Sequence, residues 1–230
     1  MFYLTGDTHR DFERLEELLY YTEGADEDVL IILGDVGINY HGFAADYELK
    51  RELSELPVTI FCVYGNHEMR PENITSYEKI EWNGGDVFWE QEFPNLIFAI
   101  DGEIYELDGL RCLVIGGANS VDKHRRTRGI NWWEDEQPSE EIKQRVEDRL
   151  EVENWKVDIV FSHTCPYKYL PIKAFLPLVE EQEHSADIST ELWLDKIEDK
   201  LTYSRWYCGH FHTDERIDNM HFMYQGFEEL

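Results

Sequence analysis

Aspartate, asparagine and histidine recur in this chain at the ends of apolar segments, where their side chains could bind a cation. The strings are GDTH at 6–9, GDVG at 34–37, GNHE at 65–68, SHT at 162–164 and GHFH at 209–212. Only Phe211 separates His210 from His212, so an extended backbone points both imidazoles to the same side. Two neutral imidazoles are poor core material but good metal ligands. Each string alone also fits a capping turn or a polar strand end, so the inference rests on the whole set.

The set as a whole indicates a centre for two metal ions. Its donors are too many for one catalytic ion with an open position, but they suit two ions that share a bridging carboxylate. Carboxylate and amide oxygens mixed with imidazole nitrogens favour Mn²⁺ first, then Fe or Zn²⁺, over Ca²⁺ or a thiolate zinc site. The candidate ligands are Asp7, His9, Asp35, Asn66, His163, His210 and His212.

The elements that would position these donors alternate between strand-like and helical patterns. Apolar runs predict strands over 2–7, 28–35 and 58–66, and helical spacing predicts helices over 11–21 and 43–56. Strand–helix–strand order favours parallel pairs with covering helices. Sites in such sheets gather beyond the carboxyl ends of the strands, so the polar strand ends can converge.

The second half of the chain predicts an antiparallel section followed by more helices and strands. Three short apolar runs occupy 95–117, and Asp-Gly at 101–102 and at 108–109 is a hairpin signal at both places. Later patterns predict helices over 139–154 and 190–201, and strands over 157–163, 206–212 and 221–227. No repeat or linker is visible, so we expect one domain over residues 1–230 with two sheets.

Composition fits a folded domain and argues against some partners. The 230 residues are 42% apolar and 14% aromatic, which is enough for a sizeable core. The chain has 21 Lys+Arg against 49 Asp+Glu, and the net charge of −28 disfavours long nucleic acid and anionic membranes. A small phosphorylated substrate or a phosphoprotein stays compatible, because bound divalent cations reverse the local potential.

Cysteine usage and the short apolar runs predict a cytoplasmic location. Met1 leads into FYLTGDTH, where charged residues interrupt any export signal, and the longest apolar runs, such as 58–64, are of strand length. The cysteines are far apart in the sequence, which favours reduced and mostly buried thiols. They are Cys62, Cys112, Cys165 and Cys208.

Together, the five strings resemble the motifs of the calcineurin-like metallophosphoesterases. DTH at 7–9, GD at 34–35, GNHE at 65–68, SH at 162–163 and GHFH at 209–212 stand in the order of that family and span most of the chain. The resemblance implies an α/β fold of four layers, αββα, with two mixed β-sheets packed as a sandwich and flanked by helices. It also implies a dinuclear metal centre that hydrolyses phosphoric ester bonds.

The resemblance assigns a role to each candidate residue. The first metal ion would be held by Asp7, His9, Asp35 and His212. The second would be held by Asn66, His163 and His210, with Asp35 bridging the two ions. His67 would not be a ligand. It would steady the phosphoryl oxygens and give a proton to the leaving oxygen, so that His67 and Asp35 would be the catalytic residues.

This arrangement suits phosphoester hydrolysis on physical grounds. A phosphoester resists attack because its oxygens are negative and water is a poor nucleophile. Two cations roughly 3.5–4 Å apart clamp the phosphoryl oxygens and lower the pKa of a bridging water, so that hydroxide attacks phosphorus in line. An acid near the leaving group, here His67, typically adds ~10²–10⁴-fold to the rate.

Two positions depart from the protein Ser/Thr phosphatase branch of that family. In that branch an aspartate three residues after the GD motif supports the catalytic histidine, and the arginine after it binds phosphate. Ile38 and Asn39 stand at those positions here. This departure argues against a protein phosphatase of that type, and it leaves Asn39, His41 and Glu68 as candidate substitutes.

The segment 116–136 is a second candidate part of the site. Its basic residues fall within six positions and are Lys123, Arg125, Arg126 and Arg128. We expect this loop to overhang the metals, with Arg125, Arg126 or both gripping a substrate phosphate bidentately, beside Asn66 and His67. The alternative is a basic loop that pairs with acidic surface groups.

The other aromatic and imidazole side chains are expected to have structural roles. Trp132 and Trp133 could stack on a nucleobase or aryl group, but packing within the loop is the more common role. His124, His184 and His221 are expected at the surface.

Three functions compete for this sequence. The first is a dinuclear-metal phosphoesterase acting on phosphomonoesters or small phosphodiesters, with protein phosphatase or nuclease as variants. The second is a non-catalytic metal-binding scaffold, which predicts eroded ligands or a replaced acid, whereas every expected ligand and His67 are present. The third, a nucleotide-binding loop protein, lacks any GxxxxGK[ST] or GxGxxG string.

Overall fold

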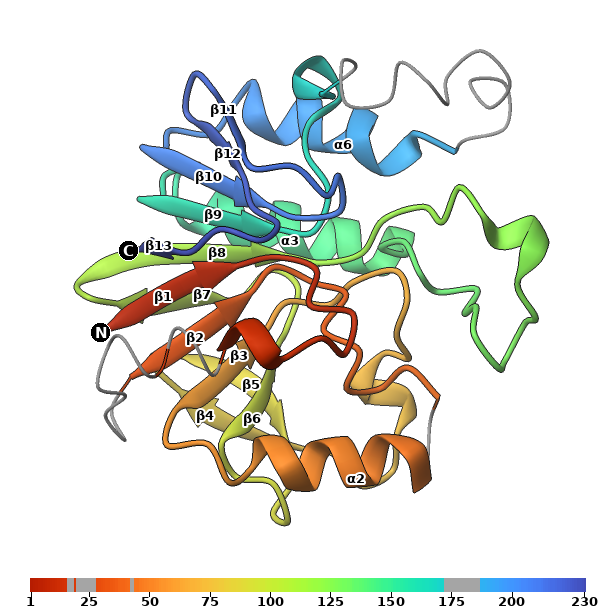
Figure 1. Cartoon of the computed structure of the whole chain (residues 1–230). Coiled ribbons are helices and arrows are strands. Elements are labelled where there is room, and N and C mark those ends of the chain that lie inside the picture. The colour runs from red at the N-terminus through yellow and green to blue at the C-terminus, as the bar shows by residue number, and fades with distance from the viewer. Residues whose placement is uncertain (16–18, 20–27, 42–43, 172–186) are drawn as a thin grey trace.

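A computed structural model describes residues 1–15, 19, 28–41, 44–171 and 187–230, and its strands form two sheets (Figure 1). The first sheet has seven strands in the order β13-β1-β2-β3-β6-β5-β4. Its parallel strands are β1 (Phe2–Thr5), β2 (Val29–Ile32), β3 (Thr59–Cys62) and β6 (Leu96–Ala99). Antiparallel neighbours flank them, namely β4 (Glu78–Trp82), β5 (Gly85–Trp89) and β13 (Glu228–Glu229).

The second sheet has six strands in the order β11-β12-β10-β9-β8-β7. Its parallel strands are β8 (Leu110–Ile115), β9 (Ile159–Ser162), β10 (Arg205–Cys208) and β12 (Met220–Phe222). At the two edges, β7 (Ile104–Leu107) pairs antiparallel with β8, and β11 (Glu215–Ile217) pairs antiparallel with β12. Both sheets are therefore mixed, as the fold prediction requires.

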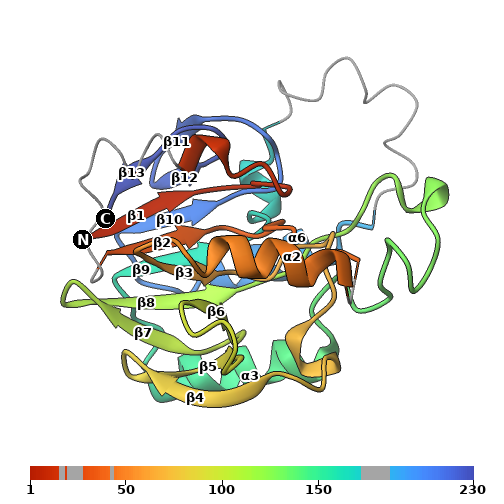
Figure 2. The same ribbon diagram turned by 60° about the horizontal axis from the view of Figure 1, so that its bottom comes forward.

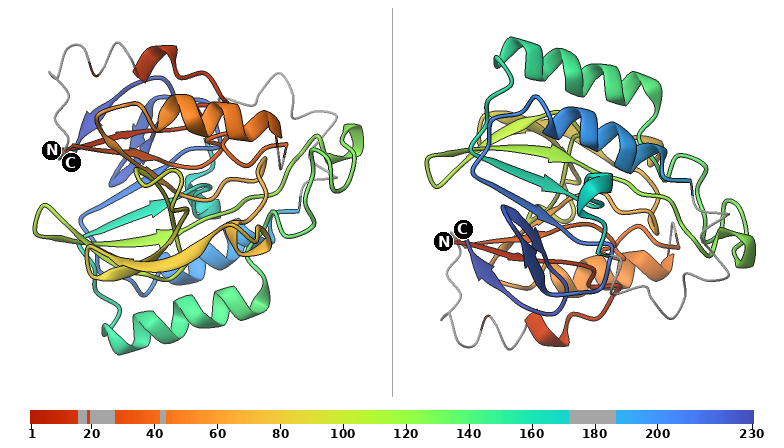
Figure 3. Two further views of the ribbon diagram at one scale, coloured as in Figure 1. Left: turned by 90° about the horizontal axis from the view of Figure 1, so that it is seen from below. Right: turned by 90° about the horizontal axis from the view of Figure 1, so that it is seen from above.

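Alternate residues of one strand pack into different cores because strand side chains alternate between faces. In β2, Ile31 packs with residues of both sheets, whereas Leu30 and Ile32 pack with Leu53 of α2 (Ala44–Leu53). In β9, Val160 packs instead against α3 (Glu140–Val152) and α6 (Ser189–Glu198). Figures 2 and 3 show the resulting layers, with α2 outside the first sheet and α3 and α6 outside the second. The predicted sandwich flanked by helices is confirmed.

The helices begin and end close to the predicted positions. The hydroxyl of Ser139 caps α3 by accepting the Ile142 N–H at 3.3 Å, and the first-turn glutamates complement the helix dipole. One-turn 3₁₀ segments also occur at Pro71–Asn73, Lys123–Arg125 and Tyr167–Tyr169. Of the helix expected over 11–21, residues 16–18, 20 and 21 lie outside the described residues.

The two Asp-Gly pairs have different outcomes. Asp108-Gly109 joins β7 and β8 in an antiparallel hairpin with φ of 51° and 76°, as predicted. The hairpin predicted at Asp101-Gly102 is wrong, because β6 and β7 lie in different sheets and this turn carries the chain between them. The Asp101 carboxylate is held there by Arg70 at 2.7 Å and by the N–H of Gly116 at 2.5 Å.

A hairpin not expected from the sequence joins β4 and β5 at Asn83-Gly84, where φ is 46° and 84°. Asn-Gly between two strand-like runs is the signal that could have revealed it.

The four cysteines are free and buried, in agreement with the sequence. Within the part of the chain that the structure describes, no helix has both the length and the apolar content to cross a membrane.

Candidate metal centre

The polar strings lie in loops that follow β1, β2 and β3 of the first sheet and β9 and β10 of the second (Figure 1). Backbone hydrogen bonds join these loops. The Asp7 N–H donates to the Gly34 carbonyl at 3.2 Å, and the Gly209 N–H donates to the His163 carbonyl at 3.0 Å. Between the sheets, the His210 N–H after β10 donates to Asp7 Oδ2 after β1 at 2.8 Å, so the carboxyl ends of parallel strands from both sheets meet at one edge of the sandwich.

The backbone at this edge adopts conformations that side chains usually avoid. Five candidate ligands have φ between 45° and 66°, in the left-handed region, and they are Asp7, His9, Asp35, His210 and His212. Such a conformation costs about 1–3 kcal/mol at each non-glycine residue and persists where the surrounding structure enforces it. Strained residues gather at functional sites, so their concentration here is independent evidence for one.

Two of the glycines that directly precede candidate ligands, Gly34 before Asp35 and Gly65 before Asn66, are required by close packing. A Cβ on Gly34 would lie 2.1 Å from Nδ1 of His163, and a Cβ on Gly65 would lie 2.1 Å from the Asp35 nitrogen. No other residue fits at either position without displacing a candidate ligand. The repeated glycine in the strings thus reflects how tightly the loops pack against one another.

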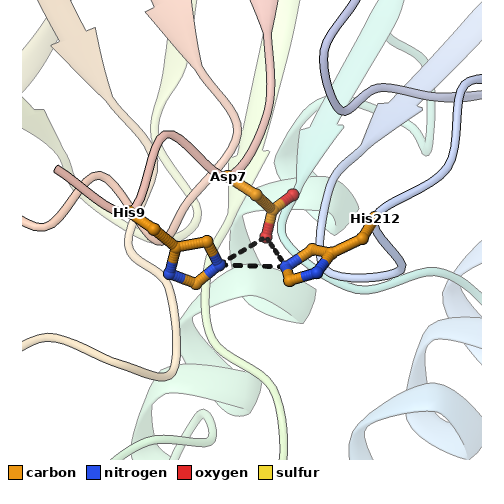
Figure 4. A group of neighbouring side chains, drawn as sticks. All are labelled: Asp7, His9 and His212. Carbon is orange, nitrogen blue, oxygen red and sulfur yellow. Dashed lines mark hydrogen bonds and ion pairs between the residues drawn. The ribbon is translucent and has the colours of Figure 1, made fainter. Parts of the chain in front are cut away.

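Asp7, His9 and His212 form one candidate ligand group, which we name the outer group (Figure 4). The Nε2 atoms of His9 and His212 lie 2.9 Å apart, and Asp7 Oδ1 lies 3.9 Å and 3.6 Å from them. In Figure 4 the two imidazoles flank the Asp7 carboxylate from opposite sides. The side chains of His9 and His212 are 34% and 48% exposed, so this group faces solvent.

Asp35, Asn66 and His163 form a second candidate group, which we name the inner group. The His163 Nε2 atom lies 3.6 Å from Asp35 Oδ1 and 2.8 Å from Asn66 Oδ1, and all three residues are buried. His210 lies beside this group, with its ring centroid 5.0 Å from that of His163. Its backbone N–H donates to Asp7 Oδ2 at 2.8 Å, which orients the Asp7 carboxylate.

The Asp35 carboxylate of the inner group also faces the outer group. Its Oδ1 atom faces His163 of the inner group, and its Oδ2 atom lies 3.7 Å from Nε2 of His9 in the outer group. Burial raises the pKa of Asp35, but attraction to His163, His67 and His9 outweighs burial and holds the pKa below its ordinary value. Asp35 is therefore a carboxylate that can contact a cation on either side.

In the inner group, the lone pairs of two ligand atoms, His163 Nε2 and Asn66 Oδ1, point toward each other. His163 Nδ1 lies 2.8 Å from the Leu33 carbonyl, so the ring proton of the neutral imidazole sits on Nδ1. The Nε2 lone pair then faces Oδ1 of Asn66, whose amide nitrogen donates to the Ser120 hydroxyl at 2.9 Å. Two lone pairs at this distance repel unless a cation or a proton lies between them.

The outer group also contains an atom whose lone pairs lack a cation or a hydrogen-bond donor in the described part of the chain. Within the described residues, Asp7 Oδ1 is buried and has no hydrogen-bond partner, although such atoms are nearly always paired. Atoms that share one ion at about 2.1 Å lie roughly 3.0–3.4 Å apart, close to the 2.9 Å between the two imidazole nitrogens. The donors of both groups therefore fit divalent cations with mixed oxygen and nitrogen ligands.

His67 lies beside both groups. Its Nε2 atom is 3.8 Å from Asp35 Oδ2, and its backbone N–H donates to Asp35 Oδ1 at 2.9 Å. Burial and the neighbouring Arg126 lower the pKa of His67, against the opposing attraction of Asp35. Within the described residues, Nδ1 of His67 has no hydrogen-bond partner, so no carboxylate supports it.

Of the two arginines expected near substrate, Arg126 contacts the site. Its Nη2 atom donates to Nε2 of His67 at 3.2 Å, while Asp122, Tyr40 and the Asn131 carbonyl accept from its other nitrogens. Four of its five N–H groups are thus used, which leaves one for a phosphoryl oxygen rather than a bidentate pair. The exposed Arg125 side chain instead donates to His124 at 3.2 Å.

Other residues of the 116–136 loop hold the loop itself. Lys123 donates to the Asn119 side chain at 2.9 Å, and Arg128 pairs with Glu134. The indole N–H of Trp132 donates to Glu136 at 2.7 Å, which agrees with packing within the loop. Of the four basic residues, Arg126 and Arg128 pair with carboxylates, as the alternative interpretation expects, and Arg126 also reaches His67.

The protein Ser/Thr phosphatase branch has an aspartate and an arginine where this chain has Ile38 and Asn39. Within the described residues, no side-chain hydrogen bond to His67 comes from the candidate substitutes, which are Asn39, His41 and Glu68. Asn39 donates to the Tyr77 hydroxyl at 3.1 Å. The buried Glu68 carboxylate accepts the N–H groups of Gly65 at 2.9 Å and Gly37 at 3.3 Å. Burial and the nearby Asp35 raise the pKa of Glu68 to about 8. Glu68 thus joins two ligand-bearing loops.

Several contributors to the site were missed from the sequence. Ser120 orients Asn66, and Tyr40 and Asp122 orient Arg126. Ser120 and Asp122 lie in the 116–136 segment, but no local pattern singles out their contacts, so only the fold reveals them. The surface prediction for His221 is wrong, since it is 8% exposed and packs on Tyr207. His184 lies outside the described residues.

Comparison with known proteins identifies a family for most of the chain. The family model described as calcineurin-like phosphoesterase matches residues 1–214. That range includes all five strings and both ligand groups. No curated protein matches the chain significantly.

Solved structures also resemble this chain at low sequence identity. The protein TT1561 of Thermus thermophilus is 16% identical, with a TM-score of 0.49 over 91% of this chain and 80% of its own. Phosphopantetheinyl hydrolase of Mycobacterium tuberculosis is 16% identical, with a TM-score of 0.40 over 97% and 87%. AQ665 of Aquifex aeolicus, a protein of unknown function, is 19% identical, with a TM-score of 0.35 over 71% and 80%.

Proposed function

The chain belongs to the calcineurin-like phosphoesterase family, and we propose that it hydrolyses phosphomonoesters or small phosphodiesters at a pair of divalent cations. One observation carries this proposal. Two groups of oxygen and nitrogen donors, one partly exposed and one buried, lie next to each other, and the Asp35 carboxylate of the buried group also lies 3.7 Å from His9 of the other group. Membership of the family supports metal-dependent phosphoester chemistry in general.

We assign the cations to the two groups. Asp7, His9, Asp35 and His212 would hold the outer ion, and Asp35, Asn66, His163 and His210 would hold the inner ion. Mn²⁺ is our first choice, because imidazole, carboxylate and amide ligands suit it, and Fe or Zn²⁺ would also fit. When bound, two such ions neutralise charge on the phosphoryl oxygens and lower the pKa of a water.

The residues around the ions would orient and protonate the substrate. His67 would give a proton to the leaving oxygen, a step that typically contributes ~10²–10⁴-fold. Nε2 of His67 accepts from Arg126 in the structure, so it would first take up a proton as this contact is released. The free N–H of Arg126 would hold a phosphoryl oxygen, and the amide of Asn66 would stay fixed by Ser120. The backbone N–H groups of His67 and His210 would keep Asp35 and Asp7 aimed at the ions.

The substrate is proposed to be small or to present its phosphate on an accessible side chain. The net charge of −28 opposes a long polyanion, whereas a single phosphoryl group meets the cations and Arg126.

Ligands from both sheets and a family match over 1–214 support one catalytic domain over residues 1–230. A cytoplasmic location would suit the four free cysteines.

The test is hydrolysis of an aryl phosphate and an aryl phosphodiester by the purified chain, with Mn²⁺ and with a chelator. We expect metal-stimulated release of the aryl alcohol from at least one of them and loss of activity in Asp35→Asn. Absence of metal-stimulated hydrolysis of both would favour the non-catalytic scaffold. A panel of monoesters, diesters and phosphopeptides would then rank the substrates.

A further inference from the structure

The ring of Tyr224 lies flat against the imidazole of His212. Their centroids are 4.7 Å apart and their planes meet at 12°, so the two rings are stacked nearly parallel. Tyr224 follows β12, beyond the residues 1–214 that the family model covers. This chain therefore places an aromatic side chain on an outer-group residue from a segment outside the family match.

Side-chain and backbone hydrogen bonds hold Tyr224 in this place. The Asp214 carboxylate accepts the N–H groups of Tyr224 at 2.8 Å, Gln225 at 3.1 Å and Gly226 at 3.1 Å. The Tyr224 carbonyl accepts from the Thr5 hydroxyl at 3.2 Å and from Arg14. Tyr224 is thus tied to Asp214, two residues after His212, and to Thr5, two residues before Asp7.

Arg14 completes this attachment. Its guanidinium donates to the carbonyls of both Tyr224 and Gly6, and it lies 5.9 Å from the centroid of the Tyr224 ring. Gly6 directly precedes Asp7. The segment that carries Tyr224 is therefore fastened next to two residues of the outer group, which makes its position relative to His212 a built feature.

The need for such a contact follows from comparison with His163. A metal-binding imidazole usually has its other ring nitrogen hydrogen-bonded, which fixes the ring orientation. Nδ1 of His163 has this bond to the Leu33 carbonyl at 2.8 Å. In the described part of the chain, no hydrogen bond reaches Nδ1 of His212, whose side chain is 48% exposed. Stacking on Tyr224 restrains rotation of that ring instead.

We propose that Tyr224 is a positioning residue that fixes the His212 imidazole for the outer cation. The inference rests on the proposed function, because it assumes that His212 is a ligand. Tyr224 acts through the face of its ring and not through its hydroxyl. A phenylalanine should therefore replace it, whereas a leucine, which has no aromatic face, should not.

Titration of the full-length protein with Co²⁺, followed by visible absorption and by calorimetry, tests this. We expect the wild type and Tyr224→Phe to bind two equivalents alike. Tyr224→Leu should bind one equivalent normally and the other about tenfold more weakly, the lower end of what loss of a ligand-orienting contact costs. Its cobalt spectrum should change in the direction seen for His212→Ala.

Phe227→Leu provides a matched control, since Phe227 lies in the same segment and packs against the core under the first sheet. Its titration should match that of the wild type, and thermal unfolding without metal should show that each variant is folded. The positioning role alone would be overturned if Tyr224→Leu bound cobalt as the wild type does. It would also be overturned if Tyr224→Phe bound cobalt as weakly as Tyr224→Leu. A folded wild type that binds no cobalt would overturn both this inference and the proposed function.

Discussion

The inner and outer groups contain similar donors but sit in different surroundings. His163 is fully buried, and its ring is fixed by a backbone carbonyl, while Ser120 fixes Asn66. In the outer group, His9 and His212 are partly exposed, and His212 is restrained by a stacked tyrosine. The inner group is thus built into the sandwich, and the outer group lies at its surface.

This difference suggests a division of labour between the two positions. Buried and hydrogen-bonded ligands lose little freedom when they bind an ion, so the inner group should hold its cation more tightly. The solvent-facing group should exchange its cation more readily and meet the substrate first. Asp35 contacts residues of both groups, so removal of its carboxylate should weaken the binding of both cations.

The largest effect is expected for Asp35→Asn. Both ions would lose a shared carboxylate, and each stabilises the transition state by several kcal/mol. Since 1.36 kcal/mol corresponds to a factor of ten, kcat/KM should fall by about 10⁴-fold or more. Metal content after dialysis, measured by mass spectrometry, should fall at the same time. A variant that retains two ions and wild-type turnover would rule out the bridge.

His67→Asn should be the next most damaging change, although both ions should stay bound. The loss of a proton donor should lower kcat/KM by about 10²–10⁴-fold for an alkyl phosphate with a poor leaving group. The loss should be much smaller for an aryl phosphate, whose leaving oxygen needs no proton. Equal losses for both substrates would argue against His67 as the acid.

His163→Ala and His212→Ala compare the two groups directly. We expect His212→Ala to lose about 10²-fold in activity at micromolar Mn²⁺ and to recover at millimolar Mn²⁺, because its cation is merely held more weakly. His163→Ala should not recover, since the cavity it leaves is buried. Activity measured across a Mn²⁺ titration checks this, and the reverse order of recovery would contradict the comparison.

Arg126→Ala should have the smallest of these effects. A charge-assisted hydrogen bond is worth about 1.5–3 kcal/mol, so KM for a phosphoester should rise by roughly 10–100-fold. Arg125→Ala is the matched control, because its side chain contacts His124 and not His67. Its steady-state kinetics should equal those of the wild type. Equal effects of the two substitutions would remove the special role of Arg126.

Much of this protein could be read from local sequence patterns. Continuous apolar runs predicted the strands around β1, β2, β3, β9 and β10, because these strands are buried on both faces. Helical spacing of apolar residues predicted α2, α3 and α6. The polar strings predicted the donor types and the family, which the match over 1–214 confirms. The assignment of ligands to two ions stays a prediction that the geometry supports.

Other features depended on contacts that no local pattern encodes. Asp-Gly makes a hairpin at 108–109 but a crossing between sheets at 101–102, where Arg70 and Gly116 hold the aspartate. The basic cluster contained several arginines, and the path of the loop decided that Arg126 reaches His67. Short strings can predict a turn, but the partner of that turn depends on the packing around it.

The sequence alone determined which atoms are available for metal chemistry and that they follow buried strands, because donor chemistry and hydrophobic period are local properties. The tertiary structure alone decided that one group is buried and the other faces solvent, and that Tyr224 stacks on His212. Those outcomes depend on how segments from distant parts of the chain pack. Packing is set by the whole molecule, since each side chain must satisfy all of its neighbours at once.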